Sequence, residues 1–416
     1  MSITHTHRMI APYHPPSNRT RSSRRADLFD RQDADPLGLR RVVTQVSHDL
    51  YGTKDVQDAI TASYVWLADQ LGHLTLGLVP TLLLSWAWVN WSAHYSVGDG
   101  WRVLGLVAIA ALIFVYWCYK EATDYQDAKK RAGKVFFFDS ADILWNVKTA
   151  LLYFGIGGLL AFTAFAFDYW LALVVVIALV VWPALRVAYW WLRRKLAFQQ
   201  AGLPYLYRLA NFTGSIDTAA KEAVIGIANL ANRKILLHRV LFGRDVVDSD
   251  TPHIRHLLLA GPLHAGKTSL AVGNGTEFAF ALGIGRYLPV AKLVQVATDP
   301  ADRPDEMDHE DGRLLWPWKQ CDLLIIDDVD AGVTTATGAI QLVEPADLER
   351  AMTAGGASTP LAWLGERRSV WVLGDATQAG AWKTVIARLM RIDEGKIATV
   401  ELQPPPVSAV GSVSSG

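Results

Sequence analysis

The chain has 416 residues, enough for two or three domains, and its 40 basic residues balance 40 acidic ones. A formal net charge of zero gives no overall attraction to nucleic acid, and two cysteines exclude a disulfide framework and a cysteine metal cluster. Hydrophobic residues make up 51% of the chain and its mean hydropathy is +0.18, which is high for a soluble protein.

Residues 1–53 are predicted to form a basic, largely disordered cytoplasmic tail. The stretch NRTRSSRRADLFDRQDADP is rich in Arg, Ser, Asp and Pro, and the first forty residues lack the apolar run of a secretory signal peptide. Three roles stay open for the arginines of this tail: contact with nucleic-acid phosphates, contact with anionic lipid, or orientation of the membrane segments. These arginines are Arg19, Arg21, Arg24 and Arg25.

Residues 54–200 are predicted to be a membrane domain with four transmembrane helices. The helices are expected at about 74–95, 102–119, 149–167 and 169–191, where apolar runs reach the roughly 20 residues that span a bilayer. The alternative is a set of buried core helices, but four runs without a polar face could not all be hidden in a soluble domain of this size. Trp and Tyr gather at the ends of these runs, as expected at the level of the lipid headgroups.

Basic residues beside the spans predict their direction. They lie in the loop between the second and third spans and directly after the fourth, at Lys120, Lys129, Lys130, Arg131, Lys134, Lys148, Arg193, Arg194 and Lys195. The other two loops are short and hold one basic residue between them. The positive-inside rule therefore predicts that both termini are cytoplasmic. The chain is expected to be a multi-pass protein of a bacterial inner membrane, with the lipid bilayer as one partner.

The remaining chain is divided into three parts. Residues 201–235 are expected to be a helical linker, residues 236–403 an ATPase domain, and residues 404–416 a flexible tail. The acidic segment 299–312 is interpreted as a solvated loop, with a metal or partner site as the alternative.

A phosphate-binding loop is predicted after the apolar strand HIRHLLLA. The residues Gly261, Pro262, Leu263, His264, Ala265, Gly266, Lys267 and Thr268, followed by Ser269, fit the pattern G-x-x-x-x-G-K-[ST]. The two glycines allow backbone amides to point at phosphate oxygens, and the helix that follows directs its positive end at the same place. Lys267 is expected to reach the β- and γ-phosphates of ATP, and Thr268 to bind Mg²⁺.

Carboxylates follow a second buried strand, CDLLIIDDVD. In a parallel sheet this strand delivers them to the edge where ligands bind. Asp327 is predicted to hold Mg²⁺ and Asp328 to orient or deprotonate the attacking water, with a supporting role in Mg²⁺ binding or hydrogen bonding as its alternative. Asp330 is expected to be a turn or cap residue. A third strand, RRSVWVLGDAT, places Asp375 or Thr377 on the γ-phosphate side, and the helix AWKTVIARLMR and the strand KIATVELQ follow.

The order of these pieces resembles the AAA+ ATPases, and most of all their helicase-loader and transposition-helper branch, the IstB/DnaC-like group. GPLHAGKTSLA, ALGIGRYLPVAKLVQ, CDLLIIDDVD and RRSVWVLGDATQAGAWKTVIARLM carry the resemblance, which covers roughly residues 236–403. It implies an α/β P-loop domain with a parallel sheet, fused here to a multi-pass α-helical membrane domain that is foreign to those loaders. The chain has no room for the helical lid of many AAA+ proteins.

The resemblance also implies roles for three residues that would act after ATP binds. Asp328 stands where a Glu is common, and Asp375 stands at the γ-phosphate sensor position, where Asn or Thr is commoner. Arg388 matches an arginine that reaches into a neighbouring subunit, which implies a homo-oligomer. A surface position or a local salt bridge is the alternative for Arg388, and the reserve candidates are Arg391, Arg367 and Arg368.

Two functions follow as hypotheses. The first is a membrane-anchored, cytoplasm-facing AAA+ ATPase that binds Mg-ATP and uses hydrolysis to remodel or move a protein or DNA partner. The second is a slow or non-hydrolysing nucleotide switch that gates a membrane effector or scaffold, which the two unusual aspartates favour. A transporter that uses the spans as a pore is poorly supported, because no ionisable residue of the kind that marks an ion pathway was found inside the apolar runs.

Overall fold

The structure is a computed structural model, and it describes a large part of the chain. The described residues are 37–44, 58–131, 136, 139–167, 170–228, 254–298, 308–310, 313–330, 333–334, 340–341, 344–353, 361–374 and 378–403. Asp375 and Thr377, most of the basic tail, most of the acidic segment 299–312 and the tail 404–416 lie outside them.

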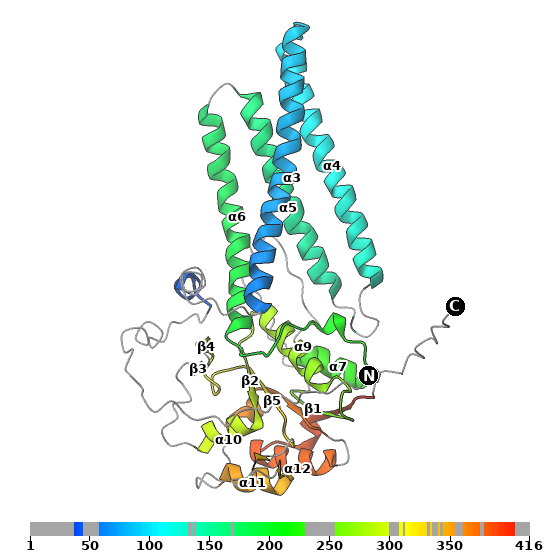
Figure 1. Cartoon of the computed structure of the whole chain (residues 1–416), viewed down its shortest axis with the longest axis vertical. Helices are drawn as coiled ribbons and strands as arrows, with labels where there is room; N and C mark the ends of the chain where they lie inside the picture. The colour runs from blue at the N-terminus through cyan, green and yellow to red at the C-terminus, as the bar shows by residue number, and fades with distance from the viewer. Residues whose placement is uncertain are drawn as a thin grey trace, which may run out of the picture. The chain divides into compact units, whose positions relative to one another are not determined.

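Four long helices form the N-terminal region (Figure 1). They are α3 (Asp58–His94), α4 (Asp99–Arg131), α5 (Asp139–Ala166) and α6 (Trp170–Gln199). The segments Leu67–His94, Asp99–Asp127, Leu144–Ala166 and Ala172–Gln199 are long and apolar enough to cross a membrane, so the expectation of four such helices is confirmed. The helices run beyond the expected span ends because helical structure continues through the polar residues that flank each apolar run.

Large apolar side chains point outward from these helices. Leu83 and Leu112 are 62% and 66% exposed, and Leu179 is 68% exposed. A soluble protein rarely leaves so much contiguous apolar surface in water, whereas a hydrocarbon environment solvates it. The outward face of the helices therefore fits a lipid bilayer.

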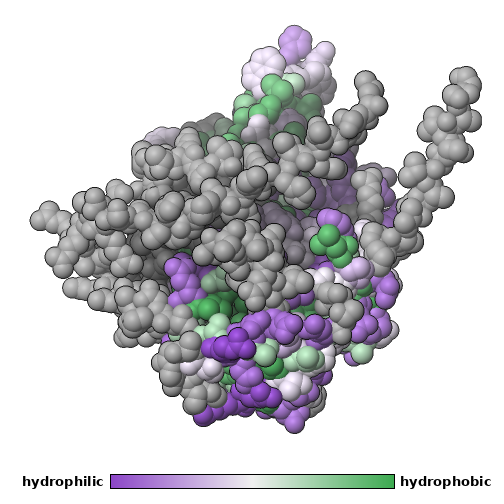
Figure 2. Space-filling view, turned by 60° about the horizontal axis from the view of Figure 1, so that its bottom comes forward, coloured by the Kyte–Doolittle hydropathy of each residue, from purple (hydrophilic) through white to green (hydrophobic). Residues whose placement is uncertain are grey.

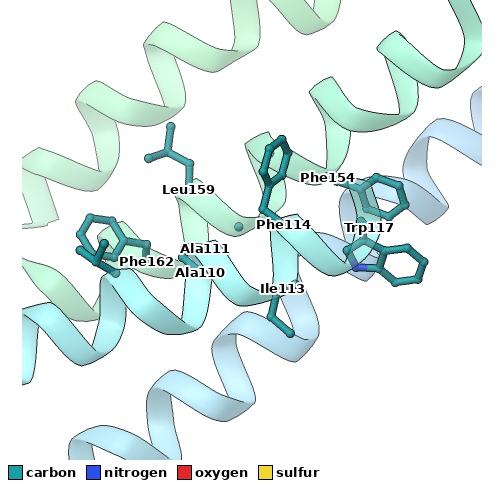
Figure 3. Close-up of a pocket in the computed structure, with 11 residues that line it drawn as sticks. Ala110, Ala111, Ile113, Phe114, Trp117, Phe154, Leu159 and Phe162 are labelled. Atoms are coloured by element: carbon teal, nitrogen blue, oxygen red, sulfur yellow. The ribbon is translucent and has the colours of Figure 1, made fainter. Parts of the chain in front are cut away.

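The helices pack closely through small residues. A side chain at Gly157 of α5 would stand 2.2 Å from the carbonyl oxygen of Leu74 on α3, so only glycine fits this crossing. Next to it, the rings of Trp117 and Phe154 stack with their centroids 4.5 Å apart. A hollow of about 300 Å³ lies between α4 and α5 (Figure 3), and all eleven residues that line it are apolar, including Phe114 and Phe162. Such a lining does not resemble an ion pathway.

The second region is built on a five-stranded sheet. Its strands are β1 (His256–Ala260), β2 (Gly285–Pro289), β5 (Leu323–Asp327), β8 (Arg368–Val372) and β9 (Ile397–Glu401), in the spatial order β2-β5-β8-β1-β9. Every pair is parallel, as predicted. The carboxyl ends of all five strands therefore lie at one edge of the sheet.

Helices cover both faces of this sheet. Leu257 and Leu259 of β1 join one buried cluster with α9 (Lys267–Phe280), while Leu258 and Ala260 join a second cluster with α12 (Ala379–Met390). Because alternate residues of a strand face opposite sides, these two clusters are the two sides of a three-layer α/β/α region. The central residues of β1, β5 and β8 are mostly apolar for this reason.

Shorter elements complete the described fold. Helices α10 (Val290–Thr298) and α11 (Pro345–Thr353) lie on the α12 side of the sheet, and two hairpins pair β3 (Asp308–Glu310) with β4 (Arg313–Leu315) and β6 (Val333–Thr334) with β7 (Ile340–Gln341). Three 3₁₀ turns are η1 (Leu209–Asn211), η2 (Ala362–Glu366) and η3 (Glu394–Lys396). The exposed surface of the α/β region in Figure 2 is mostly hydrophilic where it is not grey.

The segment between α6 and β1 differs from the expected helical linker. Of the described residues 200–228, only η1 and α7 (Thr218–Ile227) are helical, and α7 begins where Asp217 accepts a hydrogen bond from the N–H of Ala220. Part of the predicted disordered tail is ordered, because residues 39–44 are helical and Leu37 and Val42 are buried. Burial of these apolar side chains stabilises the short helix although the surrounding sequence is polar.

Candidate functional site

The loop 261–268 connects the carboxyl end of β1 to the start of α9. Gly261 has a φ of 140° and Gly266 a φ of 87°, in the region that favours glycine. A side chain at Gly261 would also stand 2.5 Å from the carbonyl oxygen of Leu402. Both glycines of the predicted motif therefore occupy positions that require glycine, and α9 directs its N-terminal end into the loop.

Lys267 extends across the base of this loop. Its ammonium group is buried and donates hydrogen bonds to the carbonyl oxygens of Gly261 and Pro262, both at 2.7 Å, and of Gly374 at 3.3 Å. Gly374 follows β8, the neighbour of β1 in the sheet. An anion in the loop would compete with these carbonyl oxygens for the ammonium hydrogens.

The carboxylate of Asp327 lies beside the start of α9. Asp327 ends β5 and is 2% exposed, and its Oδ1 accepts the backbone N–H of Asp328 at 2.9 Å and lies 3.4 Å from the hydroxyl group of Thr268. The two predicted metal ligands, 59 residues apart in sequence, are therefore neighbours. Hydroxyl and carboxylate oxygens are the hard donors that Mg²⁺ prefers.

No group of three or more His, Cys, Asp or Glu that could hold a metal is found among the described residues. Thr268 and Asp327 alone would leave a Mg²⁺ ion with most of its positions open. That suits a magnesium ion that keeps several waters and completes its shell with phosphate oxygens. The donor set thus fits Mg²⁺ in company with a phosphate ligand.

Two further aspartates follow Asp327 at the edge of the sheet. Asp328 has a φ of 55° and an exposed side chain, and partial desolvation and the nearby carboxylates of Asp327 and Asp330 raise its pKa. The carboxylate of Asp330 accepts the backbone N–H of Gly374. Asp330 lies in a turn, as was expected, and its side chain also joins the ends of β5 and β8.

The other loop residues have different environments. Pro262, Leu263 and His264 are exposed, Ala265 is buried, and the hydroxyl group of Ser269 lies 3.2 Å from that of Tyr205. This agrees with a motif that demands specific residues at its two ends and tolerates PLHA between them.

Arg388 does not meet the 261–268 loop of its own chain. Helix α12 leaves the carboxyl edge of β8 and returns to the start of β9, so its last turn lies toward the opposite edge of the sheet. There the Arg388 guanidinium donates to both carboxylate oxygens of Glu349 on α11, each at 2.9 Å. The local salt bridge is thus present, and the position leaves a role at a neighbouring subunit's site as a prediction.

The reserve arginines have other partners. Arg367 forms an ion pair with Asp322, the Arg368 guanidinium lies 5.4 Å from the centre of the Phe278 ring, and Arg391 ends α12 with a φ of 56°. The roles of Asp375 and Thr377 remain predictions, because both lie outside the described residues.

Sequence reasoning missed Tyr287. This tyrosine lies on β2, beside β5, and its hydroxyl group donates a 2.7 Å hydrogen bond to Oδ2 of Asp327. From sequence alone, a tyrosine in a buried strand is normally interpreted as a packing residue. Only knowledge that β2 lies next to β5 could have brought it to the site.

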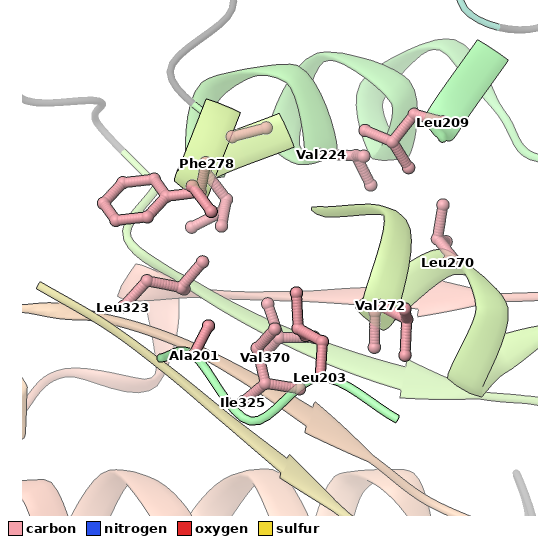
Figure 4. Close-up of a cluster of buried hydrophobic side chains, with 14 of the residues drawn as sticks. Ala201, Leu203, Leu209, Val224, Leu270, Val272, Phe278, Leu323, Ile325 and Val370 are labelled. Carbon is pink, nitrogen blue, oxygen red and sulfur yellow. The ribbon is translucent and has the colours of Figure 1, made fainter. Parts of the chain in front are cut away.

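The segment 201–212 was also missed as a support of the site. Figure 4 shows Leu203 beside Ile325 of the sheet, and a side chain at Gly275 of α9 would stand 2.5 Å from Ile325 and 2.9 Å from Leu203. Leu209 packs elsewhere on α9, where a side chain at Gly273 would stand 2.8 Å from it. Arg208 binds the fully buried Glu277 of α9 through two hydrogen bonds of 2.6 and 3.0 Å. The two glycines that weaken the helix pattern of α9 thus allow close packing against Leu203 and Leu209.

No protein-family model matches the chain, and no relative was found among curated proteins. A function for the protein is therefore inferred from the fold and from the geometry of the site. In chemical terms, the site combines a glycine-bounded loop, a buried ammonium group, a hydroxyl group and three neighbouring carboxylates.

Proposed function

We propose that this protein is a membrane-anchored AAA+-like ATPase of the P-loop class, which binds Mg-ATP and uses hydrolysis to remodel or move a protein or DNA partner. The observation that carries the proposal is the meeting of Thr268 and Asp327 at the start of the helix that follows a Gly-x₄-Gly-Lys-Thr loop. A strand, this loop and a helix in direct succession form the context that makes the motif more than a chance match.

The residues divide the work of phosphoryl transfer. Backbone amides of residues 261–268 would hold the phosphates, and Lys267 would turn from its carbonyl partners to the β- and γ-phosphates. Thr268 and Asp327 would hold Mg²⁺, which neutralises charge that develops on the phosphate oxygens. Asp328 would orient the attacking water from its exposed position at the end of β5.

The sheet supports this location for the ligand. In the strand order β2-β5-β8-β1-β9, the chain passes from β1 to strands on one flank of β1. It later passes from β8 to β9, which lies on the other flank of β1. Ligands of open α/β sheets bind at such a switch point, outside the carboxyl ends of the strands. The loop, Asp327 and Gly374 all lie at that edge.

A second function, a slow or non-hydrolysing nucleotide switch, is favoured by one observation. The raised pKa of Asp328 and its left-handed backbone show a carboxylate crowded by Asp327 and Asp330. An aspartate also reaches less far than the glutamate common at this position. In the switch, ATP binding alone would change the state of a membrane effector or scaffold.

Phosphate release by the purified full-length protein, measured together with ATP binding, distinguishes the two functions. If the protein is an ATPase, both Lys267→Ala and Asp328→Asn abolish turnover, and only Lys267→Ala also abolishes binding. Tight binding without turnover by the wild-type protein would exclude the ATPase and leave the switch. Absence of ATP binding by the wild-type protein would exclude both.

A further inference from the structure

The carboxylate of Asp327 is held on both of its oxygens. The Tyr287 hydroxyl group donates to Oδ2 at 2.7 Å, while Oδ1 accepts the Asp328 backbone N–H at 2.9 Å and faces the Thr268 hydroxyl group at 3.4 Å. Rotation of the carboxylate about its Cβ–Cγ bond would break the contact with Tyr287. The two sides therefore fix one orientation, with Oδ1 toward Thr268.

We propose that Tyr287 is a positioning residue for Mg²⁺. It favours binding of the metal by holding the Asp327 carboxylate with Oδ1 directed at the metal position. The inference rests on the proposed function, since it assigns the orientation of a ligand to the Mg²⁺ of bound ATP. Groups that hydrogen-bond to metal-binding carboxylates fix their geometry, and their removal typically weakens metal binding by about 10–100-fold.

The contact joins the phenol hydroxyl group of Tyr287 to the carboxylate of Asp327 at 2.7 Å. An interaction of a neutral donor with a charged acceptor is among the stronger hydrogen bonds.

The backbone of Tyr287 is fixed by the residues that follow the last long helix. Its N–H donates to the carbonyl oxygen of Ala201 at 2.8 Å, and the N–H of Trp316 donates to that of Gln200 at 2.9 Å. Helix α6 ends at Gln199, and β2 is an edge strand of the sheet. The carbonyl group of Ala201 thus occupies the open edge of β2 and helps to set the position from which Tyr287 reaches Asp327.

The test uses the full-length protein in lipid nanodiscs and a fluorescent ATP analogue titrated with Mg²⁺. Tyr287→Phe should raise the Mg²⁺ concentration for half-maximal binding roughly tenfold, while binding of the analogue in EDTA stays as in the wild type. Tyr207→Phe is the matched control, because it removes a tyrosine hydroxyl group that donates to the carbonyl oxygen of Asn211 instead. It should leave the Mg²⁺ dependence unchanged.

A double mutant separates positioning from general support of the fold. In an Asp327→Asn background, Tyr287→Phe should change the Mg²⁺ dependence no further, because the group it orients is gone. The proposal is overturned if Tyr287→Phe behaves as the wild type does, if it weakens metal-free and Mg²⁺-dependent binding equally, or if the two substitutions act additively. If the wild-type protein does not bind the analogue, or if Lys267→Ala still binds it, the proposed function fails instead.

Discussion

At the scale of single residues, the site contains groups that are suited to binding a ligand but whose placement destabilises the folded state. Lys267 places a buried charge among carbonyl oxygens, and Asp328 holds a left-handed backbone next to two other carboxylates. Strained or crowded residues of this kind are common where a protein is organised for a ligand. The cost at Asp328 can be measured, because it depends on pH.

Asp328→Asn is expected to stabilise the protein at neutral pH although the proposed ATPase would lose turnover. A carboxyl group whose pKa is raised by folding destabilises the native state at pH values above its folded pKa. This cost disappears as the pH falls below the ordinary value, which is about 4 for Asp. Asparagine also tolerates the left-handed conformation. The gain in apparent Tm should therefore be largest near pH 7–8 and shrink toward pH 4, which scanning fluorimetry in buffers across this range will show. A gain that grows as the pH falls would contradict this account.

At the scale of elements, helix α9 is held on two sides. The sheet lies against one side, and residues 207–209 contact another at Gly273 and Glu277, where Arg208 reaches the fully buried Glu277 carboxylate. A buried carboxylate costs several kcal/mol unless a cation and hydrogen bonds compensate it. The segment after α6 is therefore tied to the same helix whose first turn contains Lys267 and Thr268.

Arg208→Ala is expected to lower the free energy of unfolding by about 3 kcal/mol, because it removes both hydrogen bonds to a buried carboxylate. Arg350→Ala is the matched control. Arg350 pairs with Asp347 at 3.0 Å on an exposed surface, where an ion pair contributes about 1 kcal/mol or less. Denaturant titration of both variants, followed through the α/β region, measures the difference. Equal effects would show that Arg208 does not compensate Glu277.

Local patterns in the sequence predicted the elements that carry the motif. The four apolar runs, the strand before Gly261, the strand before Asp327 and the strands at 368–372 and 397–401 are all present. These succeed because apolar runs and glycine positions are local signals. Tyr287 and the segment 201–212 could not be found in this way, since their roles depend on which elements become neighbours in space. The helical linker was expected from apolar spacing, but of its described residues only η1 and α7 are helical.

At the scale of the whole molecule, the position of Arg388 separates it from the site of its own chain. The end of α12 lies toward the edge of the sheet opposite the 261–268 loop, and Arg388 is 61% exposed beside Glu349. A residue there can complete an ATP site only on a second copy in a head-to-tail arrangement. The Glu349 pair would have to open for that contact, at the small cost of an exposed ion pair.

Co-expression of two inactive variants tests this arrangement. Lys267→Ala is expected to lose ATP binding but retains Arg388, and Arg388→Ala is expected to bind ATP but lacks the arginine. Random assembly of equal amounts places a retained arginine at a retained site in about a quarter of the interfaces, so about a quarter of wild-type phosphate release should return. Each variant alone serves as the control and should be inactive. A mixture as inactive as its components would exclude Arg388 from a role in the neighbouring site.

The carbonyl group of Ala201 connects the end of α6 with the strand that carries Tyr287. If Tyr287 orients the magnesium ligand, the bilayer and the nucleotide affect one another as two effectors of one equilibrium. A change in bilayer thickness alters the preferred tilt of a membrane helix at a modest free-energy cost per ångström. Any tilt of α6 that shifts β2 would change the affinity for Mg-ATP, and bound Mg-ATP would favour membranes of matching thickness by the same factor.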